Sequence, residues 1–274
     1  MILDFTEQVM TQFTLQFLGT GNAWSKPPIN YNTNAIVRAN GHAWLLDCGL
    51  LCPLALHARN IPVQEIDGAF ITHLHGDHAL GLEEIFFRSF FTCHRKTSLW
   101  LPYAFSQKHS QIEGSDLWEN CLRASMETLI HQDGKPKITT LEDYADIHIV
   151  RPEQPFDIFG LECGIFPVVH TAQKPAFGIT LQNTVAFTSD CTFSAKLIET
   201  LLEQNITTIF HEVYFSAPYP HAVHTSIDEL ATLPPDVRKM IILMHYADDT
   251  SREAFADAQK LGFRIAAPGA TYSF

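Results

Sequence analysis

Residues 72–78 read Thr-His-Leu-His-Gly-Asp-His, and this stretch decides how the rest of the chain is interpreted. It continues an apolar run of β type, so 68–73 is expected to be a strand that leads into the motif. Side chains alternate along a strand, which places His73 and His75 on the same side. Gly76 lets the backbone turn sharply, and the Asp-His pair that follows then returns toward the same volume.

The motif therefore gathers four metal-ligating groups, His73, His75, Asp77 and His78, within a short stretch flanked by apolar sequence. Bringing such groups together without a cation would be costly. Imidazoles and carboxylates suit zinc, and also iron or manganese. The absence of cysteine favours an open catalytic site over a closed structural one. The alternative to a metal site is a polar loop with solvated histidines.

The motif resembles the His-x-His-x-Asp-His signature of the metallo-β-lactamase superfamily. That resemblance implies an α+β fold, a four-layer αββα sandwich with its ligands on loops at one edge of both sheets. Three later stretches resemble further ligand motifs of the superfamily, in its order: PVVH ending at His170, FTSD ending at Asp190 and MHY around His245. Each is weak alone, because a histidine at a strand end is more often a core or capping residue and an aspartate more often a turn residue.

The resemblance implies two divalent metal ions, zinc above all, with manganese or iron as alternatives. It assigns His73, His75 and His170 to the first metal, Asp77, His78 and His245 to the second, and Asp190 to a bridge between them. Asp47, in LLDCG, resembles an aspartate that supports the ligand loop, although an Asx turn before Gly49 would explain it equally well.

Two cations about 3.5–4 Å apart would share a water and lower its pKa, which supplies a hydroxide nucleophile at neutral pH. Asp77 counts as a catalytic residue as well as a ligand on this view. Iron-based oxidoreductases of the superfamily usually carry a carboxylate where His75 stands here, so the sequence favours a hydrolase.

The rest of the sequence predicts strand runs followed by strand–helix alternation in each half, which indicates two packed sheets with helices outside. Expected strands are 13–19, 34–39, 42–49, 68–73, 145–150, 161–169, 176–181, 184–188, 206–211 and 239–244. Expected helices are 54–60, 77–91, 116–131, 193–204, 225–232 and 251–260. One hydrolase domain is expected over 1–274, with about 92–146 an irregular or helical insertion between the halves.

Composition narrows the class of protein. The 274 residues carry 30 acidic against 18 basic side chains, a net charge of −12, and the best basic cluster, His94-Arg95-Lys96, is short. A large nucleic-acid footprint needs clustered basic residues and is therefore disfavoured. No window approaches the roughly 18 apolar residues of a membrane span. The start, MILDFTEQVM, does not read as a secretion signal, and the six cysteines are expected to be reduced in a cytoplasmic protein.

Three stretches resemble ribonuclease Z and its relatives, which favours a phosphodiesterase: FLGTG at 17–21, HEVYF at 211–215 and HTS at 224–226. In that family a glutamate and a later histidine form a pair beside the metals. By this resemblance Glu212 orients His224, which protonates a leaving alkoxide or binds a phosphoryl oxygen. Two alternatives stay open: His224 and Thr225 cap a helix, or His221 is the proton donor.

The departures from ribonuclease Z concern its substrate. The loop NAWSKPPINYNTN lacks the Pro-x-Lys-x-Arg-Asn element, and no Gly/Pro-rich arm for tRNA is visible. Transfer RNA is therefore not the expected partner. A small phosphodiester fits better, such as a cyclic nucleotide, a short oligonucleotide or a phosphonate-derived ester. Candidate pocket residues are Tyr31, Asn32, Asn34, Tyr214 and Tyr219, although loop tyrosines are as often packing residues.

Two other functions compete with this one. A lactone or thioester hydrolase could use the same metal core, and the chain could instead be a non-catalytic metal-binding or ligand-carrier protein. The complete ligand set argues against the second. A homodimer is expected by resemblance to ribonuclease Z relatives.

Overall fold

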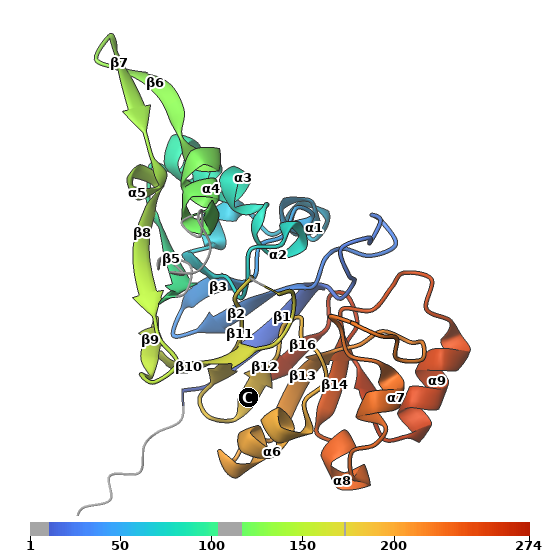
Figure 1. Cartoon of the computed structure of the whole chain (residues 1–274). Helices are drawn as coiled ribbons and strands as arrows, with labels where there is room; N and C mark the ends of the chain where they lie inside the picture. The colour runs from blue at the N-terminus through green and yellow to red at the C-terminus, as the bar shows by residue number, and fades with distance from the viewer. Residues whose placement is uncertain (1–10, 104–116, 173) are drawn as a thin grey trace, which may run out of the picture.

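Two seven-stranded β-sheets lie face to face at the centre of the computed structural model, which describes residues 11–103, 117–172 and 174–274 (Figure 1). The first sheet has the order β16-β1-β2-β3-β4-β5-β8. Its strands are β1 Phe13–Gly19, β2 Asn34–Ala39, β3 His42–Leu46, β4 Gly68–Phe70, β5 Thr97–Pro102, β8 Ala145–Val150 and β16 Thr271–Ser273. Strands β3, β4, β5 and β8 run parallel to one another, so their carboxyl ends meet at one edge.

The second sheet has the order β15-β14-β13-β12-β11-β10-β9. Its strands are β9 Phe156–Ile158, β10 Leu161–Val168, β11 Ala176–Leu181, β12 Val185–Phe187, β13 Thr208–Glu212, β14 Ile241–Met244 and β15 Arg264–Ile265. Strands β12 to β15 are parallel. Every residue of β13 and β14 is buried, as is typical of parallel strands covered on both faces.

Helices cover the outer faces (Figure 1). Those of the first half are α1 Cys52–Ala58, the single turn η1 Val63–Glu65, α2 Gly76–Ala79, α3 Leu82–Phe87 and the π-helical η2 Arg88–Thr92; those of the second half are α6 Ala195–Glu203, α7 Ile227–Leu230, α8 Pro235–Arg238 and α9 Arg252–Lys260. The core lies between the sheets, where the buried rings of Phe17 and Phe210 meet edge to face at 5.3 Å. The expected αββα sandwich is confirmed.

The segment 92–146 differs from the expectation. Strand β5 is a regular member of the first sheet, and the helix expected to reach residue 131 ends early, as α4 Leu117–Met126. A hairpin follows, β6 Thr128–Gln132 and β7 Lys135–Thr139, and then the short α5 Leu141–Tyr144. Asp133 and Gly134 make its turn with φ of 53° and 75°, the Asp-Gly signature of a tight hairpin. Residues 104–116 of this segment lie outside the described residues, and the single-domain organisation stays a prediction.

Three further expectations concern a membrane span, a secretion signal and the cysteines. No helix of the described chain is long and apolar enough to cross a membrane. The first ten residues, on which the absence of a secretion signal was predicted, lie outside the described part. The described cysteine side chains are free thiols: Cys48, Cys52, Cys93, Cys163 and Cys191.

Candidate metal centre

The predicted ligands occupy the carboxyl ends of strands from both sheets. His73 follows β4, and α2 begins within the motif at Gly76. In the second sheet His170 follows β10, Asp190 follows β12 and His245 follows β14. The structure brings all seven predicted side chains together in two groups that share Asp190, with the ligating atoms of each group within 4.8 Å of one another.

The first group consists of three imidazoles that face one another. Nδ1 of His75 lies 3.0 Å from Nε2 of His73 and 3.1 Å from Nε2 of His170. Nδ1–H of His170 donates to the carbonyl oxygen of Val223 at 2.8 Å. In the neutral ring, Nε2 therefore carries a lone pair that is directed at the centre. Oδ2 of Asp190 lies 3.8 Å from Nε2 of both His73 and His170.

The second group combines two imidazoles with two carboxylates. Nε2 of His245 lies 3.2 Å from Oδ2 of Asp77 and 3.2 Å from Oδ1 of Asp190. Nε2 of His78 lies 3.3 Å from the same two oxygens. Asp190 therefore presents one oxygen to each group, which is the arrangement expected of a bridging ligand.

Buried polar atoms without partners show that this donor set fits metal ions. Nε2 of His78 and Oδ1 of Asp190 are buried, and neither makes a hydrogen bond to any described residue. Such atoms are rare in folded proteins and are explained by an ion or ligand that they contact. Nitrogen and carboxylate donors at these positions match zinc, iron or manganese.

Protonation states agree with that fit. Burial lowers the pKa of His73 and His170, and it lowers the pKa of His75 to about 4, so these rings are neutral and able to coordinate at pH 7. Burial alone would raise the pKa of Asp190, but His245 and His78 hold it well below its usual value. The two carboxylates of the second group are therefore charged, and in the metal-free protein the raised pKa values of His78 and His245 let these rings balance that charge as imidazolium ions, which metal ions would replace.

Asp47 supports the ligand loop from behind. Nδ1–H of His78 donates to its Oδ2 at 2.7 Å, which directs Nε2 of that ring toward the centre. Thr72 donates its backbone N–H to Oδ1 and its hydroxyl to Oδ2, both at 2.8 Å. Asp47 therefore contacts the ligand loop as expected of a supporting residue, and these contacts are more than an isolated Asx turn would make.

Two supporting residues were not recognised in the sequence. Oγ of Ser189 lies 2.7 Å from Oγ1 of Thr72, and both hydroxyls lie near Nδ1 of His73, at 3.4 and 3.2 Å. Each stands immediately before a predicted ligand, His73 or Asp190, and that adjacency is the signal that could have identified them.

Glu212 clamps His224 beside the ligands. Nδ1 of His224 lies 3.1 and 3.0 Å from the two oxygens of Glu212, and its ring lies 5.0 Å from that of His170. Burial lowers the pKa of His224, but Glu212 outweighs this and raises it, which favours the imidazolium. The His224 side chain is still 31% exposed, so a substrate can reach it.

Neither helix capping nor a proton donor at His221 explains this region as well as the pairing of His224 with Glu212. Ser226 is the N-cap of α7 and forms a capping box with Glu229, so capping does not account for His224. Thr225 donates its backbone N–H to Glu212 at 3.3 Å. His221 is exposed at a turn with φ of 61°, and the described contacts of Glu212 include His224 and not His221.

The early-loop pocket residues were interpreted wrongly. Asn34 is buried and bridges Gly49 and Asp77, accepting from the N–H of the first at 3.1 Å and donating to the carbonyl of the second at 3.3 Å. Asn32 is also buried and accepts the N–H of Leu51, while the buried ring of Tyr31 packs under a guanidinium. These side chains shape the scaffold instead of facing a ligand.

The two later tyrosines remain candidates. The rings of Tyr214 and Tyr219 lie 5.6 Å apart, in the segment that leads to His224. Tyr219 is 52% exposed and so is available to a ligand.

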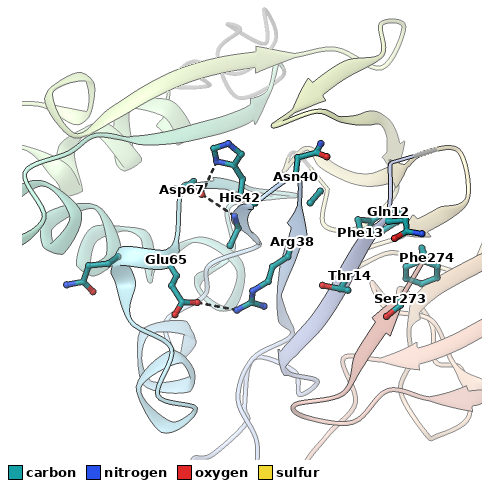
Figure 2. A pocket seen from close by; sticks show the side chains of 14 residues that line it. Gln12, Phe13, Thr14, Arg38, Asn40, His42, Glu65, Asp67, Ser273 and Phe274 are labelled. Carbon is teal, nitrogen blue, oxygen red and sulfur yellow. Dashed lines mark hydrogen bonds and ion pairs between the residues drawn. The ribbon is translucent and has the colours of Figure 1, made fainter. Parts of the chain in front are cut away.

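A hollow of about 830 Å³ lies beside the amino ends of β3 and β4, whereas the candidate ligands follow the carboxyl end of β4 (Figure 2). It includes His42, where β3 begins, and Asp67, just before β4. Its charged groups pair with each other: Nδ1 of His42 lies 3.1 Å from Asp67, and Arg38 lies 3.7 Å from Glu65. These pairs satisfy the hollow's own charges, and we assign it no ligand.

Comparison with known proteins agrees with the geometry. A family model described as "Anti-Pycsar protein Apyc1" matches residues 13–267. A protein of that name from Saccharibacillus brassicae is 37% identical over 237 residues, covering 86% of this chain and 90% of its own. The metallo-β-lactamase fold protein YhfI from Bacillus subtilis superposes with a TM-score of 0.72 at 14% identity, over 96% of this chain and all of that one. The short form of human tRNase Z gives 0.65 at 19% identity, over 94% and 98%. The fold and the resemblance to the superfamily are thereby confirmed.

Proposed function

Since the chain belongs to the anti-Pycsar protein Apyc1 family, we propose that it is a dinuclear metal-dependent hydrolase of a small, nucleotide-type phosphodiester, with a cyclic nucleotide as the leading candidate. The observation that carries the proposal is the clamp of His224 by Glu212 beside the ligand cluster. A poised imidazolium suits a reaction whose leaving group is an alkoxide.

The proposed ligand assignment follows the two groups. His73, His75 and His170 would hold one ion, Asp77, His78 and His245 would hold the other, and Asp190 belongs to both groups. When bound, the two divalent cations supply the Lewis acidity that activates water and polarises a phosphoryl oxygen. Zinc suits the histidine-rich set best, with manganese and iron as the alternatives.

The chain's own side chains supply the proton chemistry. Water attacks phosphorus, the bond from phosphorus to the leaving oxygen breaks, and Nε2–H of His224 protonates that oxygen. Glu212 accepts Nδ1–H of the same ring at 3.0 Å and stabilises its positive charge before transfer. The carboxylate of Asp77 would accept the proton that the attacking water loses, beside its role as a ligand.

Charge favours a small substrate over a long nucleic acid. The chain has a net charge of −12, and the guanidinium of Arg95 is engaged with Asp67 at 2.8 Å and with backbone carbonyls. A polynucleotide would find few basic groups along its backbone. A cyclic nucleotide presents a single phosphodiester and needs no such track. A homodimer stays a prediction from resemblance, and a cytoplasmic location stays a prediction from the sequence composition.

The test is a substrate panel on zinc-loaded protein: bis(p-nitrophenyl) phosphate, 3′,5′-cyclic purine and pyrimidine nucleotides, a thioester and a lactone. We expect turnover of the phosphodiesters and the cyclic nucleotides. Turnover of the thioester or lactone alone would establish the rival hydrolase. Stoichiometric metal uptake without turnover of any compound would establish the non-catalytic binding protein.

A further inference from the structure

The loop that follows β1 is bonded to the chain directly beside the second ligand group. Gly21 forms an isolated bridge with Tyr246, and Asn22 donates its N–H to the carbonyl of Tyr246 at 3.3 Å. Tyr246 is the residue after His245, whose Nε2 faces Asp77 at 3.2 Å. The start of this loop therefore lies against the segment that carries one ligand of the second group.

The end of the same loop lies against another ligand of that group. Thr33 donates its N–H to the carbonyl of Gly21 at 2.8 Å, so the loop closes on itself. The next residue, Asn34, donates Nδ2–H to the carbonyl of Asp77 at 3.3 Å. The loop is thus fixed between the segments of Asp77 and His245, and it stands at the edge of the second ligand group.

Trp24 stands at the corner of a tight turn in this loop. Its N–H donates to Oδ1 of Asn22 at 2.9 Å, and Ser25 donates its N–H to the carbonyl of Asn22 at 3.2 Å. The turn is tied to the segment after β14, because Asp248 accepts Oγ–H of Ser25 at 2.9 Å and the N–H of Lys26 at 2.6 Å. Bonds on both sides of Trp24 therefore hold its backbone in place.

The indole of Trp24 is 79% exposed, whereas Trp44 and Trp100 are buried. Tryptophan is on average a highly buried residue, so an indole that is held in the open beside a ligand cluster needs an explanation. Figure 1 shows the loop after β1, in blue, extending beyond the ends of the sheets. An aromatic ring on an anchored turn can bind a flat ligand at a low cost in ordering, because its backbone is already fixed.

We propose that the indole of Trp24 stacks on the nucleobase of the substrate while the phosphodiester lies at the ligand cluster, which makes Trp24 a specificity-determining residue. The proposal rests on the proposed hydrolysis of a nucleotide-type phosphodiester. The sugar separates base from phosphate, so the contact for the base belongs at the edge of the cluster, where this turn stands. Every base has a π face, so the contact favours nucleotides over phosphodiesters without a base and discriminates weakly among the four bases.

The experiment compares Trp24→Ala and Trp24→Phe with Ile29→Ala, a matched control that removes an apolar side chain, 70% exposed, from the same loop. Loss of one stacked base should raise KM for a 3′,5′-cyclic nucleotide by about 5- to 100-fold in Trp24→Ala, with kcat unchanged. The inhibition constant of adenosine 5′-monophosphate should rise by the same factor. Trp24→Phe should recover most of the loss. The inhibition constant of ribose 5-phosphate, which has no base, and the zinc content should be equal in all four proteins.

Tryptophan fluorescence supplies a readout that needs no turnover. Adenosine 5′-monophosphate should quench the emission of the zinc-loaded wild type, ribose 5-phosphate should not, and the quench should be absent from Trp24→Phe. The same quench in Trp24→Phe, or an unchanged inhibition constant of adenosine 5′-monophosphate in Trp24→Ala, would overturn the proposal. A fall in the zinc content of Trp24→Ala would also overturn it, in favour of a structural role for the turn. A wild type that hydrolyses no phosphodiester, but whose emission adenosine 5′-monophosphate still quenches, would refute the proposed function and support the base contact.

Discussion

Replacing Gly49 with alanine is expected to displace the ligand loop and disable the metal centre. A Cβ at this position would lie 1.8 Å from the carbonyl oxygen of Asp77, and 2.8 Å from its Cα. The loop cannot yield easily, because Cys48 donates its N–H to the carbonyl of His78 at 2.7 Å and Asn34 bonds both Gly49 and Asp77.

The size of the effect follows from the clash. Protein Cβ atoms do not approach other atoms closer than 3.0 Å, so Asp77 must move by about 1.2 Å. A misplacement of roughly 1 Å costs about 100-fold in rate where catalytic geometry is strict. We expect kcat/KM for bis(p-nitrophenyl) phosphate to fall by about that factor, and the zinc content measured by mass spectrometry to drop below two ions per chain.

Gly134→Ala is the matched control. Gly134 has φ of 75° with no atom within 4 Å of an added Cβ, so alanine there is strained but meets no clash, and the hairpin is remote from the metal ligands. It should lower stability by about 1 kcal/mol, measured by urea denaturation, and leave zinc content and kcat/KM unchanged. Retention of both zinc ions and full activity in Gly49→Ala would refute the argument that this contact fixes Asp77.

Three further predictions follow from the same geometry. Asp47→Asn should weaken zinc binding by about 10- to 100-fold in a chelator competition, since the residue orients His78; unchanged affinity would rule out that role. His224→Ala should lower kcat on a phosphodiester with a poor leaving group by about 10²- to 10⁴-fold at unchanged zinc content, and His221→Ala should not; the reverse outcome would transfer the proton-donor role. Burial would lower the pKa of His245, but Asp190 and other carboxylates raise it to about 10, and the pKa of His78 is raised in the same way, so the metal-free protein holds protons there at pH 7.5. Zinc uptake should release between one and two protons, seen as a dependence of calorimetric heat on buffer ionisation enthalpy, and independence from the buffer would contradict it.

The convergence of the candidate ligands could be predicted because His73, His170, Asp190 and His245 each follow an apolar strand. The run before His73, the PVVH stretch before His170 and the run before His245 all mark such ends, and the carboxyl ends of parallel strands meet. Spacing alone does not distinguish a ligand histidine from a core or capping histidine. Only the order of the motifs, which matches that of the superfamily, assigned these residues to one site. The fold followed from the same strands.

What could not be predicted depends on which way a polar side chain points. Asn32 and Asn34 read as pocket residues, but their amides satisfy backbone groups of the ligand loop. Nothing in a loop sequence distinguishes these two directions, because both uses favour a short amide. The hairpin at 128–139 turns at the Asp133-Gly134 pair, a tight-turn signal, but the helical spacing of 116–131 predicted a helix over its first strand.

The division of the ligands between the two sheets has a consequence for assembly. Four come from the turn after β4, and three from the ends of β10, β12 and β14, so neither half of the chain can complete either ion's shell alone. Bound ions would accordingly tie the halves together, and each would stabilise the native state by about 2.7 kcal/mol when the free metal concentration is 100 times its dissociation constant. The sheets must dock before tight metal capture begins, which makes ion loading a late event and a checkpoint on correct folding.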